Sequence, residues 1–436
     1  MAKAPSWRTS VAGHRVVLAR LLTPRDRDLD GGEEPLAELR RLAESAGAAP
    51  AGELVQRRER PTGSHYFGVG KAAEIKALCR RERASAVIVD AELTPIQGRN
   101  LEKELGCTVL DRTELILDIF ASWARTRQAK VQVELAGLEY FMPRLRRRWT
   151  HLERQTGGIG VRGGAGERQL ELDQRIIRDR ITDCRREIAA IGEQRRRLVA
   201  ARGGFAVSLV GYTNAGKSTL MRALTGADVY IADRLFATLD TRTREMKLGG
   251  GLSALLSDTV GFIRRLPHHL VASFSATLEE TRSADLILHV ADLSSPACRS
   301  EMETVRAVLA DLGADRTPVL PVFNKIDLVA EPSLVTRALA DHPGSVAVSA
   351  KTGAGLDGLR AAVVERMFQN AEEAELILAP AGGQSEYFLR RHGLVLESAL
   401  DGEVLRVRAR VRPEHLGKLA ELPGVSVVSR GSAGAR

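Results

Sequence analysis

The sequence predicts an α/β protein: a P-loop fold with a doubly wound sheet, preceded by a small α/β domain and an antiparallel helical hairpin, and followed by a small α+β domain. Three observations support this fold class. Short apolar runs of strand type alternate with amphipathic helical patterns in two stretches of the chain. Between these stretches, apolar residues recur at steps of three and four on both sides of a glycine-rich tract. The second alternating stretch opens with a phosphate-binding motif.

The composition points to a polyanionic partner. The 436 residues are 44% hydrophobic and carry a net charge of +9, and a chain of this length suggests roughly two to four domains. Residues 141–202 hold 16 Arg and no Lys against 8 Asp or Glu, so most of the excess charge is local. We therefore expect nucleic acid, ahead of an anionic membrane, as the partner.

The sequence predicts a soluble, cytoplasmic and monomeric protein. No apolar run reaches the roughly 18 residues that a membrane helix requires, and the start, MAKAPSWRTS, lacks the apolar core of a signal peptide. The four cysteines form no CxxC pair and have no metal-ligand spacing, so we expect buried small hydrophobic residues in a reducing cytosol. They are Cys79, Cys107, Cys184 and Cys298.

Residues 1–128 are expected to form the N-terminal α/β domain, because the strand-type runs 14–22 and 84–90 flank two helical patterns. Residues 129–202 are expected to form the hairpin with an Arg/Gly-rich loop. The apolar steps in 131–145 are repeated by heptad rows after the glycine tract, and two such seams joined by a loop favour antiparallel helices. Polar residues interrupt the second seam, so two amphipathic helices packed on neighbouring domains remain an alternative.

Residues 203–370 are expected to form the doubly wound sheet with a nucleotide site. The motif GYTNAGKS, residues 211–218, follows the strand FAVSLV and opens a helix. Its backbone N–H groups can close round phosphates, Lys217 can neutralise the β- and γ-phosphates, and Ser218 can ligate Mg²⁺. The strand before and the helix after strengthen the prediction, since a helix N-terminus favours a phosphate.

Three further motifs follow in the order of a guanine nucleotide site. In DTVG, Asp258 is expected to reach Mg²⁺ through a water molecule, and the Gly261 N–H to reach the γ-phosphate. In NKID, the Asp327 carboxylate can accept two N–H groups of guanine but faces the wrong donors on adenine. The run SAK, residues 349–351, can offer a backbone N–H to the guanine O6. Together these motifs predict a GTP site.

The first switch is expected at FATLD, residues 236–240. Thr238 is the chosen Mg²⁺ ligand when the γ-phosphate is present, with Thr241 and Thr243 as competitors. The position at which Ras-type sites carry a water-orienting Gln is Phe262 here, so we expect slow intrinsic hydrolysis that a partner accelerates. Arg264, Arg265, His268 and His269, in the second switch, are expected to form a solvated surface.

The P-loop asparagine, Asn214, has two open roles: it holds K⁺, or it caps the loop by hydrogen bonding. We assign Lys217, Thr238 and Gly261 to catalysis. The predicted nucleotide-binding residues are Gly211, Tyr212, Thr213, Asn214, Ala215, Gly216, Lys217, Ser218, Thr219, Phe236, Ala237, Thr238, Leu239, Asp240, Asp258, Thr259, Val260, Gly261, Asn324, Lys325, Asp327, Ser349, Ala350 and Lys351. Residues 371–436 are expected to form the small α+β domain, in which no pattern looks catalytic.

From about residue 14 into the tail, the chain resembles the HflX family of ribosome-associated GTPases, in the Obg–HflX group of translational GTPases. The resemblance rests on DRTELILDIFASWARTR, VQVELAGLEYFMPRL, GGIGVRGGAGERQLELD, GYTNAGKSTL, LFATLDTRTR and DTVGFIRRLPHHLVASFSATLEET. It implies binding to the large ribosomal subunit and splitting of stalled or idle ribosomes in the GTP form. It places the hairpin loop near the peptidyl transferase centre, where some members are associated with antibiotic resistance.

The tract QTGGIGVRGGAG, residues 155–166, is either a solvated linker or an RNA contact, and the resemblance favours contact with rRNA. Arginine forks bind phosphate, and arginine or tryptophan planes stack on unpaired bases. The chain departs from the family here, with Arg168 where a Thr is usual, and Ser122-Trp123 replace a usual Gln-Arg. The predicted RNA-binding residues are Arg144, Arg146, Arg147, Arg148, Trp149, Arg154, Arg162 and Arg168. Two alternatives are a GTPase that assists large-subunit assembly and an RNA-remodelling protein that uses nucleotide in its N-terminal domain.

Overall fold

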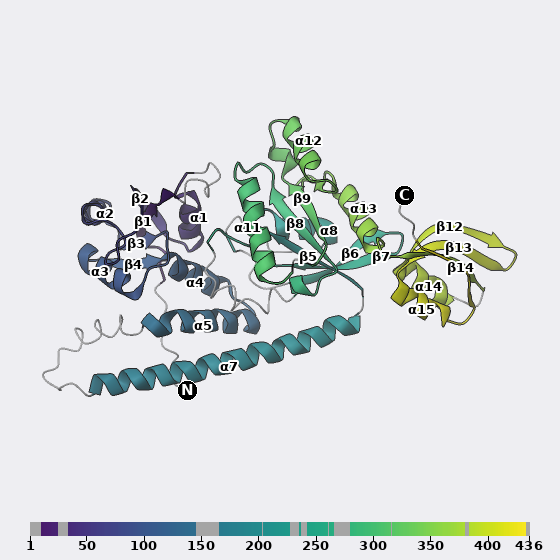
Figure 1. Ribbon diagram of the computed structural model, residues 1–436, viewed down its shortest axis with the longest axis horizontal. Coiled ribbons are helices and arrows are strands. Elements are labelled where there is room, and N and C mark those ends of the chain that lie inside the picture. The colour runs from purple at the N-terminus through teal and green to yellow at the C-terminus, as the bar shows by residue number, and fades with distance from the viewer. Residues whose placement is uncertain are drawn as a thin grey trace.

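The computed structural model describes residues 10–24, 34–144, 165–202, 204–226, 235–236, 242–259, 261–265, 280–314, 316–379 and 383–432. These residues form three sheets, which lie one after another along the long axis of the molecule (Figure 1). Within the described ranges, no helix is both long enough and apolar enough to cross a membrane. The predicted α/β fold class is confirmed.

The N-terminal domain has a parallel sheet of order β2-β1-β3-β4 with helices on both faces. Alternation along β1 explains the two layers: Val16 and Leu18 face one core, and Val17 and Ala19 face the other. The first core includes α1 and α4, and the second includes α2 and α3. The elements are β1 (Arg15–Leu22), α1 (Ala37–Ser45), β2 (Ala49–Arg57), α2 (Val69–Glu82), β3 (Ala86–Val89), α3 (Pro95–Leu105), β4 (Thr108–Asp111) and α4 (Arg112–Trp123).

The hairpin consists of α5 (Arg127–Phe141) and the long helix α7 (Ala165–Arg202), which lie side by side (Figure 1). One face of α5, including Val131 and Leu135, packs against Ile177 and Ile181 of α7. Ion pairs flank this seam, with 2.7 Å between Arg180 Nη2 and Glu134 Oε2, and 2.7 Å between Arg185 Nη2 and Glu139 Oε1. The predicted hairpin pairing is therefore present.

The opposite face of α5 belongs to the N-terminal domain. Ala129, Val133, Ala136 and Tyr140 lie in the core that contains α1 and α4. Helix α5 is thus shared, with one face on the N-terminal sheet and the other on α7. Helix α5 therefore forms the predicted hairpin with α7 and also packs on the neighbouring domain, as the alternative interpretation expected.

The central domain has a six-stranded sheet of order β10-β9-β8-β5-β7-β6, in which only the edge strand β6 runs antiparallel within the described residues. Strand β5 pairs with β7 on one side and β8 on the other, so the strand order reverses beside it. In such sheets, ligands bind at the carboxyl ends of the strands at this reversal. The elements are β5 (Phe205–Gly211), α8 (Lys217–Thr225), β6 (Arg242–Gly249), β7 (Leu252–Asp258), β8 (Leu286–Asp292), α11 (Cys298–Asp311), β9 (Val319–Asn324), the 3₁₀ turn η3 (Ile326–Leu328), α12 (Pro332–Asp341), β10 (Val346–Ala347) and α13 (Leu356–Met367).

The C-terminal domain is the small α+β domain that the sequence predicts. Its antiparallel sheet has the order β12-β13-β11-β14, and the order of elements along the chain is β-α-β-β-α-β. Leu389, Leu416 and Leu419 from the two helices pack on one face of the sheet. The elements are β11 (Glu372–Leu378), α14 (Gly383–His392), β12 (Gly393–Asp401), β13 (Val404–Val411), α15 (Pro413–Ala420) and β14 (Val425–Ser432).

A buried ion network joins the N-terminal domain to the central domain. Arg112, only 3% exposed, lies 2.5 Å from Asp90 Oδ1 through Nη1 and 3.1 Å from Glu38 Oε2 through Nη2. Nη2 also donates to the Arg264 carbonyl at 2.7 Å. Glu38 accepts a hydrogen bond from the Tyr212 hydroxyl, which itself accepts from the Arg264 N–H at 2.8 Å. The network thus holds the turn after β5 and the segment after DTVG.

Apolar contacts surround this network. Tyr212, Leu235, Phe236 and Ile263 of the central domain belong to the same core as α1, α4 and α5. The Phe236 ring stands edge-on to Phe120, with 4.6 Å between the ring centroids. Both switch segments therefore have described residues that pack into the N-terminal domain.

The expected solvated surface is wrong for Arg264, which is half-buried, whereas Arg265 is exposed as expected. The Arg264 backbone bonds to Arg112 and Tyr212, and Arg265 Nη1 lies 3.8 Å from the buried carboxylate of Asp90. The physical reason is the acidic Glu38–Asp90 pair of the facing domain, which attracts this basic segment. His268 and His269 lie outside the described residues.

Replacing Arg112 with Leu is expected to lower the free energy of unfolding by about 3–5 kcal/mol, because Glu38 loses its buried cation and Asp90 keeps only Arg20, whose Nε lies 3.3 Å from Oδ2, and the more exposed Arg265. Urea-induced unfolding would measure the change. The matched control is Arg180→Leu, which breaks the more exposed pair with Glu134 and should cost at most about 1 kcal/mol. Equal losses for the two variants would contradict a special role for the buried network.

The stability of the central domain is expected to fall on acidification because of His289. This residue on β8 is 1% exposed, and neither ring nitrogen has a hydrogen-bond partner among the described residues. Burial, together with the charges of Arg306 and Lys217, lowers the pKa of His289 from 6.5 to about 4. At a pH between these two pKa values, His289 is protonated in the unfolded chain but neutral in the folded chain.

The contribution of His289 should be fully present above pH 6.5 and be lost as the pH falls toward 4, by about 3 kcal/mol in total. Unfolding measured at several pH values should show a reduced acid slope in His289→Leu, with the exposed His14→Gln as the control. An unchanged slope in His289→Leu would show that other groups carry the pH dependence.

Candidate nucleotide site

The P-loop lies between the end of β5 and the start of α8, at the point where the strand order reverses. Gly216 takes a left-handed conformation with φ +91°, and a Cβ there would lie 2.3 Å from Asn324 Nδ2. Only glycine fits both requirements without displacing Asn324. The loop can therefore approach a phosphate closely while resting on the end of β9.

Lys217 is buried at the centre of this loop. Its Nζ donates to the carbonyl oxygens of Gly211 and Tyr212, at 3.0 and 2.8 Å. Burial lowers the pKa of Lys217 to about 8, and the carboxylate of Asp258 opposes that shift. A phosphate in the loop would supply the anion that this buried ammonium group lacks.

Two oxygen-bearing side chains meet beside Lys217. Ser218 Oγ donates to Asp258 Oδ2 at 2.7 Å, and Asp258 ends β7 with no exposed surface. A hydroxyl and a carboxylate so close together match the hard oxygen ligands that Mg²⁺ requires. Thr238, predicted as the second direct ligand, lies outside the described residues, as do Ala237, Leu239, Asp240, Thr241 and Val260. The competitor Thr243 lies on β6, where its hydroxyl bonds to Ser257 Oγ at 3.0 Å.

The DTVG segment is attached directly to the P-loop. Thr213 N donates to the Phe262 carbonyl at 2.7 Å, and Phe262 N donates to the Gly211 carbonyl at 3.1 Å. A Cβ on Gly261 would lie 3.0 Å from Lys217 Nζ, so the Gly261 backbone lies next to the ammonium group. Lys217 and Gly261, two of the three residues assigned to catalysis, are thus neighbours.

The Phe262 side chain points away from this site. It is 2% exposed and packs with Val210, Ile287 and Val305, in the core beneath α11. The aromatic ring serves the packing of the central domain, and it cannot orient a water molecule at the phosphates.

The guanine-recognition motifs meet at the same edge of the sheet. Asn324 Nδ2 donates to the Ala215 carbonyl at 2.9 Å, and its Oδ1 accepts from the Ala350 N–H at 3.0 Å. Ser349 Oγ donates to Asp327 Oδ1 at 2.6 Å. Asn324 therefore ties the P-loop to the SAK turn, and Ser349 orients the carboxylate that would read the base. Lys325 Nζ pairs with Asp292, 2.6 Å away.

One predicted nucleotide-binding side chain lies elsewhere. Phe236 packs against Phe120 in the N-terminal core, so its side chain does not line the nucleotide site. The aromatic ring packs on the apolar surface of α4, and the local sequence motif cannot predict this contact. Tyr212 also divides its contacts, since its carbonyl oxygen faces Lys217 while its hydroxyl reaches Glu38.

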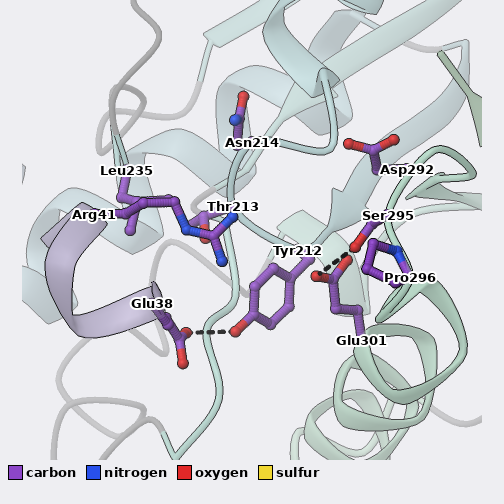
Figure 2. Close-up of a pocket in the computed structure, with 10 residues that line it drawn as sticks. All are labelled: Glu38, Arg41, Tyr212, Thr213, Asn214, Leu235, Asp292, Ser295, Pro296 and Glu301. Carbon is purple, nitrogen blue, oxygen red and sulfur yellow. Dashed lines mark hydrogen bonds between the residues drawn. The ribbon is translucent and has the colours of Figure 1, made fainter. Parts of the chain in front are cut away.

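A cavity of about 190 Å³ lies beside the P-loop, and helix α1 of the N-terminal domain forms one of its walls (Figure 2). In Figure 2, the Arg41 side chain extends from α1 toward Thr213, and Asp292 and Pro296 lie on the opposite side. The lining residues are Glu38, Arg41, Tyr212, Thr213, Asn214, Leu235, Asp292, Ser295, Pro296 and Glu301. This cavity shares Tyr212, Thr213 and Asn214 with the P-loop but is not lined by Lys217, Ser218, Asp258 or Asp327, so the N-terminal domain lies next to the nucleotide site. No motif of the sequence predicts this neighbour.

Arg144 is the predicted RNA-binding residue whose side chain the structure describes, and it is buried. Its guanidinium donates to the Tyr140 and Leu93 carbonyls at 3.0 and 2.9 Å, and it lies 3.6 Å from the centroid of the Tyr140 ring. These contacts anchor the end of α5, so we leave Arg144 out of the RNA surface. Arg146, Arg147, Arg148, Trp149, Arg154 and Arg162 lie outside the described residues, and of Arg168 only its place in α7 is described.

Comparison with known proteins matches three family models along the chain. Residues 33–121 match "GTP-binding GTPase N-terminal", residues 123–202 match "GTP-binding GTPase Middle Region", and residues 206–325 match "50S ribosome-binding GTPase". A GTP-binding protein of the archaeon Sulfolobus solfataricus, solved with GDP, is 24% identical. That comparison covers 81% of this chain and 99% of the other, with a TM-score of 0.42.

Curated relatives are far more similar. GTPase HflX of Caldanaerobacter subterraneus is 43% identical, covering 92% of this chain and 91% of the relative. GTPase HflX of Magnetococcus marinus is 41% identical, covering 97% and 99%, and that of Escherichia coli is 44% identical, covering 86% and 87%. Because such relatives match most of both chains and the P-loop geometry is present, this chain belongs to the HflX family of GTPases, and it binds and hydrolyses GTP.

Proposed function

We propose that this chain is a cytoplasmic, GTP-gated factor that binds the large ribosomal subunit as a monomer and splits stalled or idle ribosomes. The observation that carries the proposal is the shared helix α5. One face of α5 lies in the core that holds Phe236 and Ile263, and the other face packs on α7. A nucleotide-dependent shift of the switch segments would therefore press directly on the base of the hairpin.

The hairpin is the part that we propose to touch rRNA, near the peptidyl transferase centre. Its loop carries Arg146, Arg147, Arg148, Trp149, Arg154 and Arg162, and Arg168 follows in α7. Guanidinium groups suit phosphate, and the glycines of 155–166 permit close backbone approach. The family model that matches the central domain is described as a 50S ribosome-binding GTPase, which supports this partner.

Within the nucleotide site, we propose that Ser218 and Thr238 ligate Mg²⁺ directly and that Asp258 acts through a water molecule. The ion would neutralise charge on the β- and γ-phosphates. Lys217 would add a second positive charge there, and the Gly261 N–H would donate to the γ-phosphate. Asp327, oriented by Ser349, would accept the two N–H groups that guanine presents and adenine lacks.

Asn214 is proposed to hold K⁺ beside the phosphates. It has a left-handed φ of +63°, it is exposed, and its side chain lines the cavity. Capping of the loop would need a hydrogen bond from this side chain, and none is made to a described residue. The Asn214 amide oxygen is thus available to a cation.

Hydrolysis by the isolated protein is expected to stay below about ten turnovers per second, because Phe262 cannot orient water. We expect the rate to be at least about tenfold higher in KCl than in NaCl, since a monovalent cation can stabilise charge that develops on the phosphates. Phosphate release at matched ionic strength would measure both rates.

The matched variant for this measurement is Asn214→Ala, which should remove the difference between the two salts while leaving GTP affinity nearly unchanged. If Asn214→Ala retains the full KCl advantage, the asparagine is not the K⁺ ligand. A slower rate in both salts would support the capping role.

Sucrose-gradient sedimentation tests the ribosomal function. Vacant ribosomes incubated with the protein and a non-hydrolysable GTP analogue should separate into subunits, because the GTP-ordered switches hold the hairpin in its binding position. With GDP, the ribosomes should stay joined. Lys217→Ala, which removes the phosphate-facing cation, should abolish splitting.

Deletion of residues 157–166 is expected to remove splitting but not intrinsic GTP hydrolysis, since none of these residues belongs to the nucleotide-binding motifs of the sequence. Joined ribosomes that persist while the protein binds free large subunits would instead favour assembly of that subunit. Splitting driven by ATP after Lys217→Ala would favour the RNA-remodelling alternative. Unchanged affinity and splitting in the deletion variant would make the loop a linker.

A further inference from the structure

A second cavity, also of about 190 Å³, lies where the central domain meets the C-terminal domain. The start of β5, parts of β6 and β7, and the end of α13 line it from the central domain. The C-terminal domain contributes the last residues of α14 and the first turn of α15. The described lining includes none of the predicted nucleotide-binding residues, so this cavity is separate from the GTP site.

The two domains give this cavity different surfaces. The C-terminal domain supplies two arginines and two histidines, namely Arg391, His392, Arg412 and His415. The central domain supplies buried apolar side chains, namely Phe205, Met367 and Phe368. The guanidinium groups are always charged, and they are strong donors to anionic oxygen. A cavity with this lining suits a small ligand that carries negative charge.

The basic side chains are held together by direct contacts. The His392 and His415 rings lie 4.4 Å apart between centroids, and Arg412 Nη2 lies 3.1 Å from His415 Nε2. Because a guanidinium only donates, His415 Nε2 accepts this hydrogen bond. The Arg412 guanidinium also lies 5.6 Å from the centroid of the Phe205 ring, across the domain junction. The cluster is therefore arranged before a ligand arrives, which lowers the entropy cost of binding.

The carboxylates near this cluster do not neutralise its interior. Glu414 Oε1 lies 3.2 Å from Arg412 Nη1, but the Glu414 side chain is 62% exposed, whereas that of Arg412 is 19% exposed. Glu245 lines the cavity from β6 and is exposed, as is Arg391. Water and salt screen exposed charges more strongly than buried ones. The positive charge of Arg412 therefore prevails inside the cavity.

The imidazole of His392 is available to a ligand. Its ring packs against Phe388 and His415, and its nitrogens make no hydrogen bond to a described residue. Burial, together with His415 and the charges of Arg391 and Arg412, lowers the pKa of His392 to about 4. The ring is thus neutral at neutral pH, and it carries one N–H that can donate to an anion.

We propose that this cavity is a second anion site, which binds the phosphate group of a small molecule, either inorganic phosphate or a small phosphate monoester. Arg412 and Arg391 would supply charge and donors, and His392 would add an N–H. A tetrahedral phosphate presents oxygens in several directions, which suits donors that come from two separate elements. One water molecule takes about 30 Å³ in the liquid, so the cavity has room for an ion several times larger.

A bound phosphate would join the two domains at the beginning of β5. Arg412 faces Phe205, the first residue of that strand, and β5 ends at Gly211 of the P-loop. The site is complete only when both domains are in place, because each supplies part of its lining. Phosphate should therefore stabilise the contact between the domains.

NMR of the histidine rings in the full-length chain tests the proposal. The protein carries ¹³C-labelled histidine, and a non-hydrolysable GTP analogue fills the P-loop so that phosphate cannot bind there. Inorganic phosphate is added at neutral pH and compared with sodium chloride at matched ionic strength. Of the nine histidines, His392 and His415 should shift saturably, with one half-saturation point at about 1 mM or below. His392→Gln and His415→Gln assign the two signals.

Neighbouring arginines provide a matched pair of variants. Arg391→Gln removes a charge that lines the cavity, whereas Arg390→Gln removes one from the same helix that pairs with Glu386, 2.8 Å away. Arg391→Gln should weaken phosphate binding by at least about threefold, and the more buried Arg412→Gln by at least about tenfold. Arg390→Gln should leave the affinity unchanged.

Methyl phosphate distinguishes the two sources of the phosphate group. Tighter binding than that of inorganic phosphate would assign the apolar side of the cavity to the organic part of an ester. Weaker binding would assign the site to the free ion, because the methyl group then occupies a position where an oxygen is needed.

The titration of the unmodified chain and the comparison of Arg391→Gln with Arg390→Gln stand even if Arg412→Gln fails to fold. The proposal is overturned if the His392 and His415 signals move in proportion to phosphate without saturating, as a general salt effect does. Equal affinities in Arg391→Gln and Arg390→Gln would overturn it as well, because the charge that lines the cavity would then contribute nothing.

Discussion

The rest of the structure depends on the buried guanidinium of Arg112. It lies between the carboxylates of Asp90 and Glu38, and it donates to the backbone of the segment after DTVG. A charge this deeply buried is tolerated only when partners compensate it from every side. Those partners come from the residue after β3, from α1 and from the central domain, so the compensation fixes how the domains meet.

This arrangement gives α5 its position. The helix enters the same core as Phe236 and Ile263 on one face, which leaves its other face for α7. A helix buried on two sides shows almost no polar stripe, and α5 accordingly has nine buried residues in its fifteen. The long α7 then needs only a narrow apolar seam, and its remaining surface can stay rich in arginine.

Local patterns in the sequence predict the elements and the nucleotide motifs well, because strand alternation, helical periodicity and the P-loop are set by residues close in the chain. Contacts between domains join residues far apart in the chain, so local patterns do not predict them. The sequence predicts Phe236 as part of a switch, but its ring packs on Phe120. The sequence predicts Arg144 as an RNA ligand, but its guanidinium anchors the end of α5. The sequence feature that hints at such contacts is an acidic residue at the end of an apolar run, such as Asp90. A local motif does not identify the partner of such a residue.

Tyr212 is a described residue whose contacts connect the phosphate loop to the domain interface. Its carbonyl oxygen accepts from Lys217, and its hydroxyl donates to Glu38. A bound phosphate competes for the Lys217 ammonium group, because an anion compensates a buried cation better than a carbonyl dipole does. The Tyr212 backbone is then released from one side while Glu38 still holds its ring. Nucleotide occupancy and domain contact therefore act on the same residue, so each must alter the free energy of the other.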